Sequence, residues 1–180
     1  MKITMIRHAK VKMRWPSRCN SEEFDAACQA YDKAEIVKPS KKPRKIRKAK
    51  VFISDLDRTR WTAEGLFRDT DFTVLGDIRE VKMNSFTDTE RKLPLFIWYF
   101  FGRLQWLRND ERQAETRRES VQRAQTAIDR CEAEGRDCIL VTHGFFLKIL
   151  MRELKKRGYA IRGNNRPLIR NLQEITAYKD

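Results

Sequence analysis

Histidine, paired cysteine and long apolar runs are scarce in this 180-residue chain. It contains two histidines, and none of its four cysteines stands in a C-x-x-C pair. Zinc sites and disulfide frameworks need closely spaced groups of such residues, so we predict reduced thiols, no metal ion and no cofactor.

We expect neither a targeting segment nor a membrane-spanning one. Residues Met1–His8 form one short apolar strand pattern, without the cationic start, long apolar stretch and small-residue cleavage site of a signal peptide. The most apolar segment, Leu93–Leu107, is too short to span a bilayer and is interrupted by Arg103 and Gln105. We therefore expect a cytoplasmic protein without a membrane partner.

The segment Leu93–Leu107 has several interpretations. We favour a buried helix, with Pro94 near its start. The alternatives are a flap over an active site, an oligomer contact such as a homodimer interface, and a patch that touches a membrane surface.

Positive charge, by contrast, is abundant: the formal net charge is +14, and eight lysines and arginines fall between Lys38 and Lys50. A protein this basic attracts anions and associates with nucleic acid at low salt. The segment carries Pro39 and Pro43 and no aromatic residue for base stacking. We therefore interpret it as a solvated connector and predict no specific nucleic-acid partner.

Strand and helix patterns alternate along the chain. We expect strands over Lys2–Arg7, Val51–Ser54, Phe72–Leu75, Cys138–Thr142 and Leu172–Tyr178, and helices over Ser21–Lys33, Thr59–Phe67, Ala114–Glu132 and Gly144–Arg157. This alternation predicts an α/β fold in one domain, residues 1–180. Its mostly parallel central sheet is flanked by helices in a three-layer sandwich.

Both histidines directly follow predicted strands. His8 comes after Arg7, and His143 stands before Gly144, while Arg58 follows the strand that ends at Ser54. Open α/β sheets bind ligands beyond the carboxyl ends of their strands, so these side chains are expected to surround one point. Arginine grips two phosphoryl oxygens at once, and a neutral imidazole can attack phosphorus. A carboxyl group must then protonate the leaving oxygen.

These motifs resemble those of the histidine phosphatase superfamily, which includes cofactor-dependent phosphoglycerate mutases and many small phosphatases. Ile3–Ala9 is similar to the strand and Arg-His-Gly signature of that family, with Ala9 in place of glycine. Ser54–Glu64 is similar to its S-x-L-x-R-A-x-Q-T-A-E stretch. Arg118–Ser120 and Ile139–Gly144 match its later motifs in order, and the resemblance runs from residue 1 to about residue 154.

The resemblance implies a phosphoglycerate mutase-like fold and a small phosphorylated substrate. By position, His8 is the nucleophile, Arg7 and Arg58 bind phosphate, and His143 is a second catalytic histidine that contacts it. Glu80 falls where the family places its acid-base carboxylate. Asp77 and Asp55 lie nearby and compete with Glu80 for that role.

The chain departs from the family pattern in two places. The family often has serine or threonine three residues after the nucleophile and asparagine six after it, where this chain has Val11 and Arg14. The usual glycine-rich, tryptophan-containing segment after the acid is absent from Val81–Asp88. These departures leave the shape of the substrate unspecified.

Four functions fit the motifs to different degrees. We favour a metal-independent phosphomonoester phosphatase that forms a phosphohistidine on His8. The alternatives are a phosphotransferase of the phosphoglycerate mutase type, a magnesium-dependent phosphatase with Asp55 as nucleophile, and a non-catalytic protein that binds anions or nucleic acid. The magnesium-dependent alternative follows from Ser54–Thr59, which resembles the D-x-D-x-T motif of haloacid dehalogenase-type phosphatases.

Overall fold

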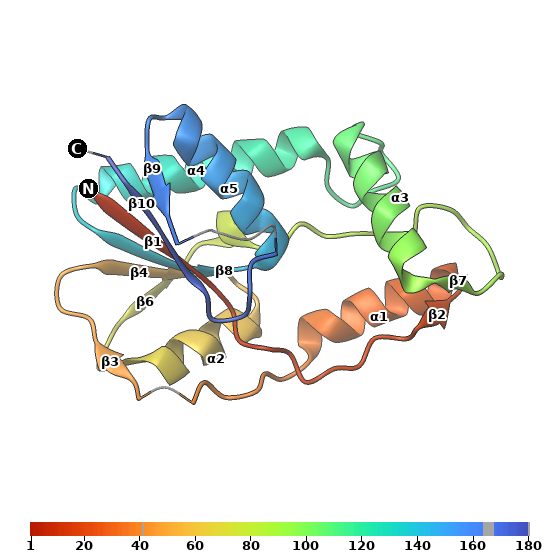
Figure 1. The fold of residues 1–180 in the computed structure, drawn as a ribbon, viewed down its shortest axis with the longest axis horizontal. Coiled ribbons are helices and arrows are strands. Elements are labelled where there is room, and N and C mark those ends of the chain that lie inside the picture. Colours follow the sequence, from red (N-terminus) through yellow and green to blue (C-terminus); the bar gives the residue numbers. More distant parts are fainter. Residues whose placement is uncertain (41, 164–167, 180) are drawn as a thin grey trace.

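A six-stranded, mostly parallel sheet runs through the molecule, with helices on both faces (Figure 1). The computed structural model describes residues 1–40, 42–163 and 168–179. The strands are β1 (Lys2–Arg7), β2 (Arg18–Cys19), β3 (Arg44–Lys45), β4 (Lys50–Ile53), β5 (Phe67–Arg68), β6 (Phe72–Val74), β7 (Leu93–Pro94), β8 (Cys138–Thr142), β9 (Ala160–Arg162) and β10 (Glu174–Tyr178). The helices are α1 (Ser21–Lys33), α2 (Asp57–Leu66), α3 (Leu95–Leu107), α4 (Arg117–Ala133) and α5 (Gly144–Lys156), with a 3-10 turn η1 (Gly76–Ile78).

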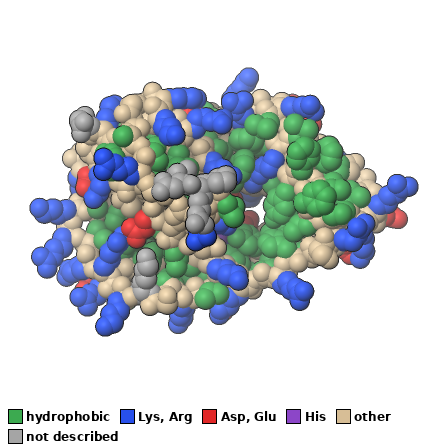
Figure 2. All heavy atoms as spheres, viewed as in Figure 1, with side chains coloured by type: hydrophobic (Ala, Val, Ile, Leu, Met, Phe, Trp, Pro, Cys, Tyr) green, Lys and Arg blue, Asp and Glu red, His purple; other side chains and the backbone are tan. Residues whose placement is uncertain are grey.

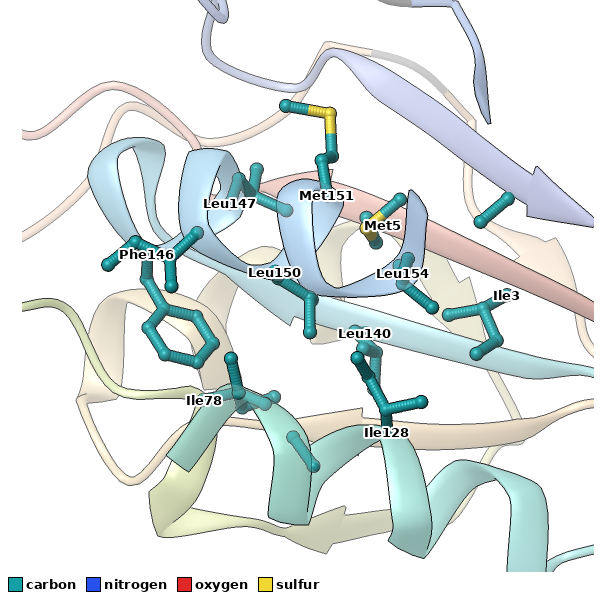
Figure 3. Packing of buried hydrophobic residues seen from close by; sticks show 14 of the residues in the cluster. Ile3, Met5, Ile78, Ile128, Leu140, Phe146, Leu147, Leu150, Met151 and Leu154 are labelled. Atoms are coloured by element: carbon teal, nitrogen blue, oxygen red, sulfur yellow. The ribbon is translucent and has the colours of Figure 1, made fainter. Parts of the chain in front are cut away.

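Two apolar layers hold the helices to the sheet. The strand order is β6-β4-β8-β1-β10-β9, and β6, β4, β8 and β1 pair in parallel. Alternate residues of β8 face opposite sides: Leu140 packs with α4 and α5, whereas Val141 packs with α2. Figure 3 shows the first layer, in which Met5 and Leu140 meet Leu150 and Ile128. The predicted three-layer fold is therefore confirmed.

The sheet order brings the predicted site residues together. Strand β8 lies between β4 and β1, with Arg7 opposite Thr142 in the register. His8, Ser54 and His143 each follow one of these three strands, so they emerge side by side at one sheet edge.

Helices α1 and α3 form a lobe beyond this edge (Figure 1). Helix α1 begins with a capping box, in which Asn20 and Glu23 each bond to the backbone N–H of the other. Such a cap contributes about 1 kcal/mol. The lobe has its own apolar cluster, in which the rings of Phe24 and Trp98 stack at 5.3 Å.

The prediction of a buried helix within Leu93–Leu107 was wrong in part. The helix exists as α3, with Pro94 as its N-cap, and its Trp98 and Trp106 are buried. Its outer face is exposed, however: Phe96 is 70% and Phe100 is 63% accessible. Figure 2 shows apolar side chains over this part of the surface. Helix α3 covers a small lobe on one side only, so its apolar residues outnumber the positions it can bury. None of the described helices is long and apolar enough to cross a membrane.

The basic segment Lys38–Lys50 contains more structure than a plain connector. Within it, β3 pairs in parallel with β5, and Arg44 forms an ion pair with Glu174 at 3.1 Å. The partners lie far along the sequence, which is why local composition did not indicate them. Lys41 lies outside the described residues.

Candidate active site

His8 is fixed at the end of β1 by backbone and side-chain contacts. The backbone N–H of His8 donates to the carbonyl of Thr142 at 2.8 Å, and the side-chain amide of Asn171 donates to the carbonyl of His8 at 2.9 Å. The imidazole Nδ1 lies 2.7 Å from the Ala9 carbonyl oxygen. A carbonyl can only accept, so Nδ1 carries the proton and Nε2 keeps a free lone pair.

The environment of His8 keeps its ring neutral. The side chain is buried, and the residue is 1% accessible. Burial, and then the positive charges of Arg58 and Arg7, lower its pKa from 6.5 to about 3, although the Ala9 hydrogen bond opposes the change. A neutral imidazole is the form that can act as a nucleophile near pH 7.

His143 lies beside His8, with ring centroids 5.1 Å apart. Arg58 Nε donates to its Nδ1 at 3.2 Å, so its Nε2 carries the proton and donates to Ser54 Oγ at 2.8 Å. Burial, and then the charge of Arg58, hold its pKa well below the usual value. Both ring nitrogens of His143 are thus engaged.

Arg58 projects from the first turn of α2 into the buried site. Asp32, on α1, accepts from its Nη1 at 2.9 Å, and the Tyr31 ring lies 5.1 Å from the guanidinium carbon. Its Nη2 is buried and has no hydrogen-bond partner among the described residues.

Arg7 approaches the same site from β1. Its Nη1 donates to the Ile169 carbonyl at 2.6 Å, while its Nε is buried and lacks a partner in the described part of the chain. The lack of a side chain at Gly144 leaves room for the Arg7 guanidinium, because a Cβ at residue 144 would lie 2.9 Å from Arg7 Nε. A larger residue there would displace the guanidinium.

Two buried guanidinium nitrogens, Arg7 Nε and Arg58 Nη2, have no partner among the described residues. An unsatisfied buried donor costs about 1–3 kcal/mol, and more when the group is charged. Proteins rarely leave such donors unpaired unless a ligand completes them. An oxyanion between Arg7 and Arg58, beside His8, would satisfy both donors.

Glu80 lies where the start of α5 meets the η1 loop. Its two oxygens accept the backbone N–H groups of Phe145 and Phe146, at 3.1 and 2.9 Å, and Oε1 also accepts that of Val81 at 3.0 Å. The carboxylate thus caps the helix that begins directly after His143. To carry a proton that it can donate, Glu80 must lose part of its hydrogen bonding to these backbone N–H groups.

The competing carboxylates are placed differently. Asp55 is engaged by both Nε and Nη2 of Arg79, and neither Asp55 nor Asp77 lines the cavity described below. Within residues 1–40, 42–163 and 168–179, no three His, Cys, Asp or Glu side chains cluster closely enough to hold a metal ion.

A cavity of about 830 Å³ opens onto this site. Arg7, Arg58 and Glu80 line it, and so do Asp32 and Arg103, which the sequence analysis did not identify as site residues. Asp32 comes from α1 and Arg103 from α3, outside the motifs at the strand ends. No sequence signal separates them from ordinary charged helix residues. Neither His8 nor His143, both of which are buried, lines the cavity.

Comparison with known proteins identifies the family. The model of the histidine phosphatase superfamily (branch 1) matches residues 3–169. The chain belongs to the histidine phosphatase superfamily. No curated protein matches this superfamily member significantly.

Solved structures with the same fold share little sequence with this superfamily member. A phosphoserine phosphatase mutant from Entamoeba histolytica, in complex with phosphoserine, is 13% identical over 97% of this chain and 89% of its own, with a TM-score of 0.56. The α-ribazole phosphatase of Shigella flexneri is 16% identical over 96% of both chains, with a TM-score of 0.53. A mycobacterial glucosyl-3-phosphoglycerate phosphatase is 18% identical over 86% and 79%, with a TM-score of 0.51.

The departure after the nucleophile, at Val11 and Arg14, lies away from the cavity, whereas Val81–Asn84 of the second departure line it. Val11 is buried with Ala9 and Ile36, and Arg14 is exposed. Neither residue lines the cavity. In this superfamily member, therefore, any contact that the family makes through those positions has to come from other side chains.

Proposed function

We propose that the protein is a phosphomonoester phosphatase that acts through a phosphohistidine on His8 and needs no metal ion. The observation that carries this proposal is the pair of unpartnered, buried nitrogens, Arg7 Nε and Arg58 Nη2, beside a neutral histidine with a free Nε2.

In the first step, the arginines hold the phosphoryl oxygens while His8 Nε2 attacks phosphorus. The N–P bond forms as the bond from phosphorus to the ester oxygen breaks. Glu80 gives its proton to the departing oxygen, which leaves as an alcohol. Arg7 and Arg58 offset the charge that spreads over the phosphoryl oxygens, which is the main source of rate enhancement in phosphoryl transfer. His143 contacts the same oxygens in its other tautomer, in which Ser54 Oγ donates to Nε2 and Nδ1–H donates to the phosphate in place of the bond from Arg58.

In the second step, water replaces the alcohol. Glu80, now a carboxylate, takes a proton from the water as its oxygen attacks phosphorus, and the N–P bond breaks. Inorganic phosphate leaves, and both His8 and Glu80 return to their starting forms. The Ala9 carbonyl keeps the His8 ring in one tautomer throughout.

We propose net hydrolysis in preference to phosphoryl transfer between hydroxyls of one sugar acid. A mutase must keep water from its phosphohistidine, which calls for covering segments. The segments between the motifs are short in this chain, apart from the one that carries α3. The relatives described above are phosphatases by name, which also supports hydrolysis.

Phosphate release from a panel of phosphomonoesters, with wild type and His8→Ala, tests the proposal. We expect wild type to hydrolyse at least p-nitrophenyl phosphate in EDTA, and His8→Ala to lose the activity. Loss of activity in EDTA that magnesium restores would favour Asp55 as the nucleophile. Efficient interconversion of 2- and 3-phosphoglycerate with negligible phosphate release would show a mutase, and a protein that binds phosphate without turnover would be a non-catalytic binder.

A further inference from the structure

Arg103 is a third cavity arginine, and the chemistry proposed above does not use it. It comes from the middle of α3, in the lobe beyond the sheet, and lines the same cavity as Arg7 and Arg58. Its guanidinium carbon lies 3.5 Å from the centroid of the Phe145 ring. This close stacking holds the planar group in one orientation.

The charge of Arg103 is not matched by a direct partner. Its Nη1 is buried and has no hydrogen-bond partner among the residues described, and none of their carboxylates lies within ion-pair distance of Arg103. Partly buried arginines elsewhere find such partners: Arg112 pairs with Asp88, and Arg157 with Glu132. Burial lowers the pKa of Arg103, yet a guanidinium stays protonated in proteins. Arg103 is therefore a cation that lines the cavity and keeps one donor without a partner among the described residues.

Arg103 lies near Glu80, the residue proposed to protonate the leaving group of the substrate. The Phe145 ring on which it stacks belongs to the residue after Gly144, and Gly144 lies against Arg7. The Phe145 N–H donates to Glu80, the proposed acid. Arg103 thus lies near the carboxyl group that protonates the departing oxygen.

We propose that Arg103 binds a second anionic group, a carboxylate or a phosphate, on the alcohol portion of the substrate. The preferred substrate class is then the phosphomonoester that carries two anionic groups, one at Arg7 and Arg58 and the other at Arg103. This inference rests on the proposed function and adds the substrate class to it.

Further features of the cavity agree with a doubly anionic substrate. Lys82 and Lys148 also line it, so that its cations outnumber its carboxylates, Asp25, Asp32 and Glu80. Figure 2 shows the molecule hollowed next to the apolar side chains of the α3 lobe. The volume of about 830 Å³ lies within the range of small-molecule sites and exceeds what a phosphoryl group alone fills.

Two matched pairs of substrates test the inference, with kcat/KM as the measurement. In one pair, 3-phosphoglycerate has a carboxylate where glycerol 3-phosphate has a hydroxymethyl group. In the other, propane-1,3-diol bisphosphate has a phosphate where 3-hydroxypropyl phosphate has a hydroxyl. We expect wild type to prefer the doubly anionic member of at least one pair by about 10- to 100-fold, the contribution of a hydrogen bond to a charged group. The pair that shows the preference identifies the anion.

Arg103→Met should reduce that preference to within about threefold. Arg103→Lys should keep part of the preference, because lysine keeps the positive charge but lacks the paired donors of the planar guanidinium. Arg108→Met is the matched control, since Arg108 is an exposed arginine at the C-cap of the same helix, and it should keep the wild-type ratio. Melting temperatures of all variants are measured in parallel.

Three results would overturn the inference. One is a ratio near one for both pairs in a wild type that hydrolyses p-nitrophenyl phosphate through His8, which leaves the proposed function standing. Another is an unchanged ratio in Arg103→Met. The third is an equal loss on all four substrates with a lower melting temperature in Arg103→Met, which would make the stacking on Phe145 purely structural. Hydrolysis that does not depend on His8 would instead contradict the proposed function itself.

Discussion

The arginines of the cavity and the cations of the segment Lys38–Lys50 carry the same charge in opposite surroundings. The Arg58 side chain is fully buried, and one of its donors has no partner among the described residues. The Arg44 side chain is half exposed and is paired with Glu174. Most of the segment is exposed to solvent, where salt screens its charges.

This difference shows which positive charges indicate where a ligand binds. A net charge of +14 predicts attraction to anions but not a position for one. A buried donor without a partner does specify a position, because its desolvation is offset only when a ligand binds there. Substitutions should therefore have large effects at the cavity and small effects in the segment.

The largest effect should come from Arg58→Met. Loss of the guanidinium removes a donor to the phosphoryl group and the bond to His143 Nδ1. Removal of one such preorganised donor lowers turnover by about 10²–10³, so we expect kcat/KM for p-nitrophenyl phosphate to fall by at least that factor.

Arg60→Met is the matched control for Arg58→Met, since Arg60 is an exposed arginine two residues further along α2. It should behave as wild type in the same assay. Equal losses in the two variants, or near-normal activity in Arg58→Met, would remove the distinction between buried and exposed charge.

Glu80→Gln should slow esters with poor leaving groups by about 10²-fold or more, since an alkoxide needs a proton to depart. Aryl phosphates with activated leaving groups should slow far less. Asp77→Asn serves as the control, because Asp77 does not line the cavity, and it should leave both rates near wild type. Equal slowing of alkyl and aryl esters in Glu80→Gln would exclude Glu80 as the acid.

Acid should destabilise the fold through the buried histidines. The pKa of His8 is about 3 in the folded protein and about 6.5 when unfolded, so below pH 6.5 protons bind the unfolded chain preferentially. Between pH 7 and pH 5 this costs about 2 kcal/mol of stability for His8. Urea unfolding should show that His8→Gln loses less stability over this interval than wild type. A larger or identical loss in the variant would contradict the buried neutral state.

The smallest effect should follow neutralisation of Lys38, Arg47 and Lys48, which are exposed. Replacing all three with glutamine should raise the apparent substrate constant about two- to threefold at low salt. At 1 M salt, where the Debye length is about 3 Å, the variant should match wild type. A difference that persists at high salt would place this segment in direct contact with the substrate.

Local sequence signals predicted the parts of the fold that local physics determines. Helix α1 has the predicted bounds, because the capping residue Asn20 directly precedes it and the apolar spacing lies within it. Strands β1 and β8 also have the predicted bounds, since continuous apolar runs are typical of strands buried on both faces. Helix α4 begins at Arg117 rather than Ala114, because the capping box of Thr116 determines its start.

Features that depend on distant partners were not predictable in this way. The two-residue strands β2 and β7 form only because they pair with each other, although they lie far apart in the sequence. The exposure of Phe96 depends on which face of α3 packs onto the lobe. In the site, the motifs indicated Arg7, His8, Arg58 and His143, and the structure brings all four to one sheet edge, whereas Arg103 became identifiable only through its burial against Phe145.

Covalent labelling of His8 tests the central claim most directly. The protein is mixed with ³²P-labelled phosphomonoester, quenched within the first turnover and mapped by peptide digestion. We expect an acid-labile, base-stable label on His8, linked through Nε2, that appears and decays at rates consistent with turnover. A label on Asp55 or another residue, or an unchanged label in His8→Ala, would contradict the proposed mechanism.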